Sequence, residues 1–112
     1  MEMIDLEAVE ALSALAQESR LAIFRLLVKA GPEGKPAGRI ALEIGVPPST
    51  LSTHLAILDR AGLLASRREG RSILYAARFD RMRALLDFLV ADCCDGRPEI
   101  CGPLGETACD RT

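Results

Sequence analysis

Four cysteines lie close together near the C-terminal end of the chain. Cys93, Cys94, Cys101 and Cys109 fall in the last fifth of the sequence, and residues 1–92 contain no cysteine. A fold stabilised by disulfides would distribute cysteines through its body, where each bridge closes a long loop. The first three form the pattern C-C-x6-C, interrupted by glycines and prolines that favour a loop folding back on itself. This spacing predicts a cluster of ligands in a metal or redox site.

Length and composition predict one small domain. The chain has 112 residues, of which 49% are hydrophobic and only 4% aromatic, so its core must be aliphatic. No apolar run approaches the roughly 20 residues that span a membrane, and the acidic residues 1–5 lack the basic region of a signal peptide. We therefore expect a cytoplasmic protein with no membrane partner. In a reducing cytosol, clustered cysteines more often form a metal or redox site than a disulfide.

The formal net charge of −2 hides a segregation of charge along the chain. Residues 60–83 carry seven arginines and two acidic residues, whereas residues 1–59 and 84–112 are each net acidic. A local basic patch binds phosphate even in an acidic protein, because salt screens charges beyond about 8–10 Å. Residues 60–83 are therefore a candidate nucleic-acid-binding segment, and a solvated arginine-rich face is the alternative.

The first half of the chain has the pattern of a helical bundle. Apolar residues recur at helical spacing and predict four helices, over residues 6–16, 21–28, 37–44 and 48–61. Glycines and prolines in residues 31–36 end the second helix, Gly45 ends the third, and Pro48 suits the first turn of the fourth. A short helix, a glycine-containing turn and a second helix are typical of a helix-turn-helix.

The fourth helix separates large apolar from small polar residues. Leu51, Leu55 and Leu58 share one face, at about 100° per residue. Small and hydroxyl side chains occupy the opposite face, which ends in an arginine and can enter a DNA major groove without steric obstruction. The candidate DNA contacts on this helix are Ser49, Thr50, Ser52, Thr53, His54 and Arg60.

His54 lies at the border between the two faces. It has two interpretations: a hydrogen bond to a phosphate or base, or a buried histidine that ties the two helices together. It is a poor candidate for a metal ligand, because the chain contains no second histidine.

Residues 63–77 have the pattern of a two-stranded hairpin. Residues 63–68 and 71–77 alternate as strands do, and Glu69-Gly70 would supply the tight turn. The hairpin tip carries Arg67, Arg68 and Arg71, which would reach adjacent phosphates or the minor groove. A plain surface hairpin is the alternative.

A last helix is expected over residues 79–92. Its apolar stripe is too wide for the core of such a small domain, and together with the first helix it predicts a dimer interface. The candidate interface residues are Leu12, Met82, Leu85, Leu86 and Leu89.

These motifs together resemble the ArsR/SmtB family of metalloregulatory winged-helix repressors. Residues 14–23 (ALAQESRLAI) resemble the family's first-helix junction, residues 49–58 (STLSTHLAIL) its recognition helix, and residues 60–75 its wing. The resemblance implies a mainly α fold with a β-hairpin wing, a winged helix-turn-helix. It also implies a homodimer that represses an operon when free of effector and leaves the operator DNA when effector binds.

The chain lacks two of the family's effector sites. Where many arsenite-sensing members place a cysteine pair, residues 35–40 read KPAGRI, and the last helix offers Asp80 and Asp87 but no histidine for a zinc site. The resemblance that remains is to arsenical-resistance repressors with a cysteine trio just after the last helix, here Cys93, Cys94 and Cys101.

The donor set agrees with that resemblance. Three thiolates without an imidazole make a soft three-coordinate site, which suits As(III) or Sb(III) as the inducer, whereas Zn(II) prefers four ligands. Cys109 lies in a polar tail and is the less favoured ligand. We therefore expect residues 1–92 to bind DNA and dimerise, and residues 93–112 to bind the effector.

Two alternative roles for the cysteines stay open. Cys93 or Cys94 could pair with Cys101 in a thiol redox switch, although Asp92 and Asp95 would raise the pKa of nearby thiols and lower their reactivity. All four cysteines could instead hold a structural zinc ion. We expect no enzyme and no organic cofactor, because the chain has neither a Cys-His pair in an evident pocket nor a phosphate-binding loop.

Overall fold

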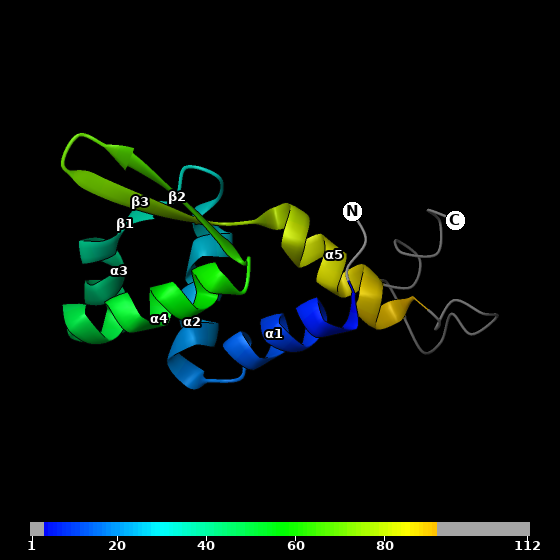
Figure 1. The fold of residues 1–112 in the computed structure, drawn as a ribbon. Helices are drawn as coiled ribbons and strands as arrows, with labels where there is room; N and C mark the ends of the chain where they lie inside the picture. The colour runs from blue at the N-terminus through cyan, green and yellow to red at the C-terminus, as the bar shows by residue number, and fades with distance from the viewer. Residues whose placement is uncertain (1–3, 92–112) are drawn as a thin grey trace.

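The computed structural model describes residues 4–91, which contain five helices and three short strands (Figure 1). Their bounds are α1 Asp5–Leu15, α2 Glu18–Ala30, β1 Lys35–Pro36, α3 Ala37–Ile44, α4 Pro48–Arg60, β2 Leu64–Glu69, β3 Ser72–Ala77 and α5 Phe79–Val90. The hairpin of β2 and β3 projects at one end of the molecule, and α5 lies beside α1 toward the other (Figure 1). The predicted fold, mainly α with a β-hairpin wing, is confirmed.

An aliphatic core joins the helix-turn-helix to the foot of the hairpin. Its most completely buried large side chains come from α2, α3, α4 and the turn before β2: Ile23, Leu27, Ile40, Leu51, Leu58 and Leu63. Burying one such side chain contributes about 1.5–3 kcal/mol. Among residues 4–91, no polar or charged residue is buried, so the core fixes the helices by packing alone.

The turn between α3 and α4 follows the predicted signals. Gly45 adopts φ 81° and ψ 37°, in the left-handed region, and its N–H donates to the carbonyl of Ala41 at 2.8 Å. A residue with a Cβ is disfavoured in this conformation, whereas glycine reaches it without a steric penalty. Pro48 then occupies the first turn of α4, where its missing N–H costs no hydrogen bond.

The sheet has three strands where the sequence predicted two. β1 pairs with β3, with Lys35 opposite Tyr75, and so adds a strand to the hairpin. A two-residue strand that contains a proline has no periodicity to recognise, and it forms only because distant residues lie beside it. The contact is close: a Cβ on Gly34 would lie 2.4 Å from the carbonyl oxygen of Tyr75.

The tip of the hairpin is one residue further along the chain than predicted. Glu69 pairs with Ser72, so the two loop residues are Gly70 and Arg71 rather than Glu69 and Gly70. Gly70 has φ +63° and occupies the first loop position, as a type II′ turn requires. Arg71 therefore lies in the loop, at the end of the wing that is farthest from the core.

Helix α1 buries its small side chains and exposes its large ones. Three alanines that are each at most 3% exposed pack it against the neighbouring helices: Ala8, Ala11 and Ala14. The large apolar side chains lie on the opposite face: Leu6 is 70%, Val9 61% and Leu12 41% exposed. The predicted helix is confirmed, but of the large residues that predicted it only Leu15 packs against the core, and the other three face away from it.

Candidate nucleic-acid interface and apolar face

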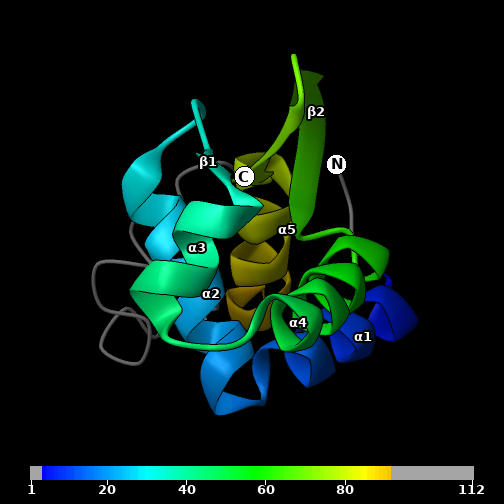
Figure 2. The ribbon, with the colours of Figure 1, turned by 90° about the vertical axis from the view of Figure 1, so that its left-hand side faces the viewer.

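Helix α4 presents the face that its sequence predicts. Leu51, Leu55 and Leu58 are buried, whereas Ser49, Thr50, Ser52, Thr53, Ala56 and Arg60 are exposed. Apart from Arg60 at the end of the helix, these exposed side chains are short, so the backbone of α4 can approach a partner surface closely on this face. Figure 2 shows α3, α4 and β2 together at the end of the molecule that faces the viewer.

His54 lies against α2. Its Nδ1 is 3.5 Å from Nη1 of Arg20, and the ring is half-buried. The Nε of Arg20 donates to the carbonyl oxygen of Ala14 at 2.7 Å, at the end of α1. This contact supports the interpretation of His54 as a tie between helices, and its contact with DNA stays a prediction. No local signal in the sequence indicates this role of Arg20, because its partner His54 is 34 residues away.

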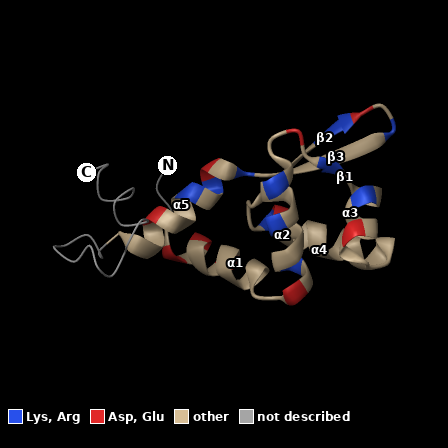
Figure 3. Ribbon diagram, turned by 180° about the vertical axis from the view of Figure 1, so that it is seen from behind, with Lys and Arg blue, Asp and Glu red and all other residues tan. Residues whose placement is uncertain are grey.

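The three arginines of the wing are not equivalent. The guanidinium of Arg67 donates to the carboxylate of Glu69 at 3.0 Å and to the carbonyl oxygens of Glu33 at 2.9 Å and Pro32 at 3.4 Å. Arg67 thereby fastens the wing to the loop before β1. Within residues 4–91, Arg68 and Arg71 form no ion pair and both are exposed. The basic residues of the wing and of α3 are visible from behind in Figure 3.

Two further cations near the helix-turn-helix are already paired. Nζ of Lys35 lies 2.6 Å from the carboxylate of Glu43, and Nε of Arg39 lies 3.5 Å from it. The hydrogen bond from Lys35, aided by the charge of Arg39, lowers the pKa of the Glu43 carboxyl. Glu43 therefore stays ionised and partly neutralises both cations. The i,i+4 spacing of Arg39 and Glu43 was a signal of this pair in the sequence.

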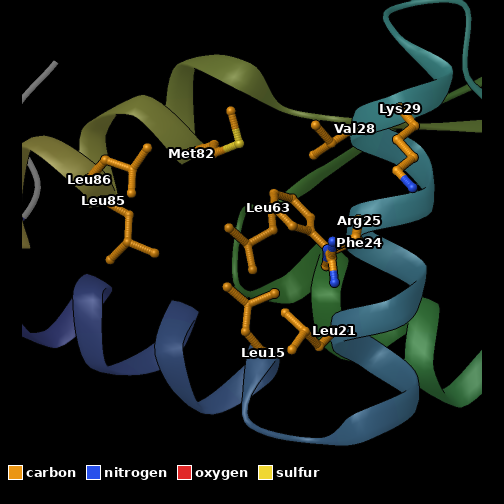
Figure 4. Close-up of a pocket in the computed structure, with 10 residues that line it drawn as sticks. All are labelled: Leu15, Leu21, Phe24, Arg25, Val28, Lys29, Leu63, Met82, Leu85 and Leu86. Atoms are coloured by element: carbon orange, nitrogen blue, oxygen red, sulfur yellow. The ribbon is translucent and has the colours of Figure 1, made fainter. Parts of the chain in front are cut away.

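A second surface of the molecule is apolar. A hollow of about 430 Å³ lies between α1, α2 and α5 (Figure 4). Its charged lining residues are Arg25 and Lys29, and the rest of its lining is apolar: Leu15, Leu21, Phe24, Val28, Leu63, Met82, Leu85 and Leu86. The exposed side chains of α1 and Leu89, which is 52% exposed, add to the apolar surface.

The predicted interface residues occupy different environments. Leu12 and Leu89 are exposed, and Met82 and Leu86 are partly buried around the hollow. Leu85 is only 5% exposed and belongs to the core of its own protomer. Leu6 and Val9 were not among the predicted interface residues, but they are more exposed than Leu12.

The four cysteines lie outside the described residues, as does the predicted boundary between residues 92 and 93. Helix α5 begins at Phe79, as predicted, and ends at Val90, three residues before Cys93. Among residues 4–91, no group of three or more His, Cys, Asp or Glu side chains is placed to hold a metal ion. No helix in this part of the chain is long and apolar enough to cross a membrane.

Comparisons with known proteins agree on the class of this chain. The family of helix-turn-helix domains matches residues 15–67, from the end of α1 into β2. The transcriptional activator HlyU of Vibrio cholerae is 32% identical over 89 residues, which are 80% of each chain. An ArsR-like transcriptional regulator from Rhodococcus sp. RHA1 superposes with a TM-score of 0.67 at 27% identity, covering 75% of this chain and 76% of that one.

A further solved structure shows how one relative of this chain assembles. The homodimeric winged helix-turn-helix DNA-binding domain of a possible ArsR-family regulator from Mycobacterium bovis has a TM-score of 0.63 at 31% identity, covering 78% of this chain and 80% of that one. HTH-type transcriptional regulators of Escherichia coli and Mycobacterium tuberculosis also match this chain, at 31% and 37% identity over 71% and 72% of it. With its exposed recognition helix and its wing, the chain belongs to the ArsR/SmtB-type family of winged helix-turn-helix transcriptional regulators.

Proposed function

We propose that this protein is an arsenite-responsive transcriptional repressor, which binds operator DNA as a homodimer and releases it when As(III) or Sb(III) binds Cys93, Cys94 and Cys101. One observation carries the proposal: every cysteine of the chain lies in the segment that directly follows α5. A ligand bound by these cysteines follows α5 in the chain, and α5 is a helix that lines the apolar hollow. The effector site and the DNA-reading helix are then coupled through the assembly of the dimer.

The DNA contacts divide into two kinds. The hydroxyls of Ser52 and Thr53 lie on the exposed face of α4 and read base edges in the major groove. Arg68 and Arg71 have no ion-pair partner within residues 4–91, and they bind phosphates beside the groove. The guanidinium of Arg67 donates its hydrogen bonds within the protein, and its role is to hold the wing against the loop before β1.

Salt dependence distinguishes these roles. Arg71→Ala should lower the slope of log K against log salt by about 1, because one phosphate contact is lost. Arg67→Ala should weaken binding while leaving the slope nearly unchanged, because its guanidinium donates to Glu33 and Glu69. The measurement is a salt titration on a duplex that the protein selects from a random-sequence pool. Equal slope changes in the two variants would contradict the distinction.

A second copy of the chain is the occupant that fits the apolar face. The alanines of α1 pack this helix against the rest of the protomer, so its exposed large side chains are not needed for the protomer's own core. A surface of this kind adjoining a hollow marks a protein-protein contact. A symmetric dimer presents two α4 helices to successive major grooves, about 34 Å apart, as an operator with two half-sites requires. The homodimeric relative supports this assembly.

The cysteine trio supplies the inducer chemistry. Three thiolates satisfy trigonal As(III), whose lone pair occupies the remaining direction. Neighbouring side chains on a helix point about 100° apart, so Cys93 and Cys94 cannot both face one ion on a regular helix. Binding at this trio therefore imposes a local conformation just beyond α5. That constraint favours a dimer arrangement whose recognition helices no longer match the operator.

The test is a titration of the complex between the protein and its selected duplex with arsenite, antimonite, cadmium, zinc and peroxide. Arsenite should release the DNA with an affinity that varies little between about pH 6.5 and 8, because exchanging three hydroxyls of arsenous acid for three thiols releases water and no net protons. Zinc and cadmium displace thiol protons, so their affinity rises with pH. Release by peroxide alone would support the redox switch, and no release by any of them would refute effector binding at the cysteines.

A further inference from the structure

The apolar hollow between α1, α2 and α5 has the size and the lining of a small-molecule binding site. Its volume of about 430 Å³ lies in the range of roughly 300–1,000 Å³ that ligand pockets occupy. Eight of its ten lining residues are apolar (Figure 4). Ligand pockets are typically lined in this way, with a small number of polar groups that orient the ligand.

The walls of the hollow are fixed by the core of the protomer. Phe24, Leu63 and Leu85 line it and are each at most 6% exposed. The backbone of Leu63 is held on both sides, because its N–H donates to the carbonyl of Leu58 at 3.1 Å and its carbonyl accepts from the N–H of Arg78 at 2.8 Å. A ligand in the hollow therefore meets a preformed surface, and its binding requires little ordering of the protein.

The hollow is a different surface from the exposed face of α1. Leu6, Val9 and Leu12 make up that face, and none of the three lines the hollow. From α1, the lining includes Leu15, the last residue of the helix. A second copy that packs on the exposed face of α1 therefore does not by itself account for the hollow.

Two cations of α2 lie beside this apolar lining (Figure 4). Arg25 and Lys29 are one helical turn apart, so they lie on the same side of the helix. Both are exposed, and neither forms an ion pair or a side-chain hydrogen bond with another residue of the described range 4–91. No acidic side chain from this part of the chain lines the hollow. An anionic group at this edge would gain two charge partners and relieve the repulsion between them.

We propose that the hollow binds an alkyl carboxylate, whose hydrocarbon chain enters the apolar lining and whose carboxylate pairs with Arg25 and Lys29. Burial of the chain drives binding, because water beside the apolar lining finds few hydrogen-bonding partners there. The carboxylate is ionised at neutral pH, so the two cations hold the charged end of the ligand at the exposed edge of the hollow. The site is independent of arsenite and of DNA binding.

The affinity for such ligands should depend on the length of the chain. The dissociation constant should fall about fourfold for each methylene added between hexanoate and decanoate, and it should stop falling once the chain fills the hollow. Isothermal titration calorimetry of the wild-type protein measures the constant and the stoichiometry, at concentrations where the ligands form no micelles. One ligand is expected for each protomer.

Decanol tests the role of the charge, because it has the same hydrocarbon chain without the carboxylate. Arg25→Gln and Lys29→Gln should each weaken the binding of decanoate about 2- to 5-fold, as expected for an exposed ion pair, and leave the binding of decanol unchanged. Arg71→Gln is the matched control, because Arg71 is exposed but does not line the hollow, and it should alter neither affinity.

Larger side chains in the lining test the location of the site. Leu21→Trp and Val28→Phe should weaken decanoate and decanol alike, because both positions line the hollow and the added ring occupies part of its volume. Leu42→Trp, at a position that is 80% exposed on α3, should alter neither affinity. Melting temperatures without ligand check that each variant is folded.

An affinity that does not change with chain length would overturn the proposal, and so would equal decanoate binding by wild type, Arg25→Gln and Leu21→Trp. The competing occupant of the hollow is a second copy of the chain. Val9→Asp places a carboxylate on the exposed face of α1 and so disfavours the dimer. Decanoate binding by Val9→Asp but not by wild type would assign the hollow to the second copy and would also overturn the proposal.

Discussion

Replacing Val9 by aspartate is expected to leave the protomer folded and to abolish its dimerisation. Val9 is 61% exposed on α1, so a carboxylate there remains hydrated in the isolated protomer. In a symmetric dimer the same change buries two unpaired carboxylates, at a cost of several kcal/mol. DNA binding should then fall at least about 100-fold, because the two half-sites are no longer bound as a linked pair. Sedimentation at micromolar concentration and the dissociation constant for the selected duplex measure both effects.

Leu42→Asp provides the matched control. Leu42 is 80% exposed on α3, away from the apolar face, and the chemical change is nearly the same. This variant should sediment as wild type does and keep its melting temperature. Val9→Asp is a cleaner test than a change at Leu86, since Leu86 is partly buried around the hollow and its replacement also disturbs the protomer. A Val9→Asp protein that still sediments as a dimer would place the interface elsewhere.

Changing any one of Cys93, Cys94 or Cys101 to serine should abolish or strongly blunt the release of DNA by arsenite. A two-thiol site lacks the third sulfur ligand, and a serine hydroxyl is a poor substitute for a soft thiolate. DNA affinity without arsenite should stay within about twofold of wild type, since the exposed face of α4 and the wing arginines lie in residues 4–91 and contain no cysteine. The readout is the arsenite concentration that releases half of the bound duplex.

Cys109→Ser is the internal control for that series. It should respond to arsenite as wild type does, because three thiols complete the trigonal site without it. A lost response in Cys109→Ser would make this cysteine a true ligand of the effector site. A normal response in the triple serine variant at positions 93, 94 and 101 would move the effector site to another part of the chain.

The features that the sequence predicted well are those that depend on neighbouring residues. The turn at Gly45, the start of α4 at Pro48 and the separation of the leucines of α4 from its hydroxyls each follow from signals within a few positions. Helix periodicity and capping act over one or two turns, so a single sequence contains them.

The features that were missed depend on residues far apart in the chain. Strand β1 exists because residues 35 and 36 pair with residues 74 and 75. The roles of Arg20 and Arg67 depend on partners 34 residues away. Periodicity also could not tell which apolar face of α1 packs inward, since alanines and leucines both recur at helical spacing. The structure resolves this ambiguity in favour of the alanines.

The placement of the exposed leucine and valine side chains on α1, apart from the hydroxyl face of α4, has a genetic consequence. On the proposed dimer, a subunit with a damaged α4 but an intact α1 should still associate with normal subunits, and the mixed pairs should occupy only half of each operator. Alleles altered at Ser52 or Thr53 should therefore be dominant in a cell that also carries the normal gene. Alleles altered at Val9 should produce subunits that do not dimerise, and these alleles should be recessive.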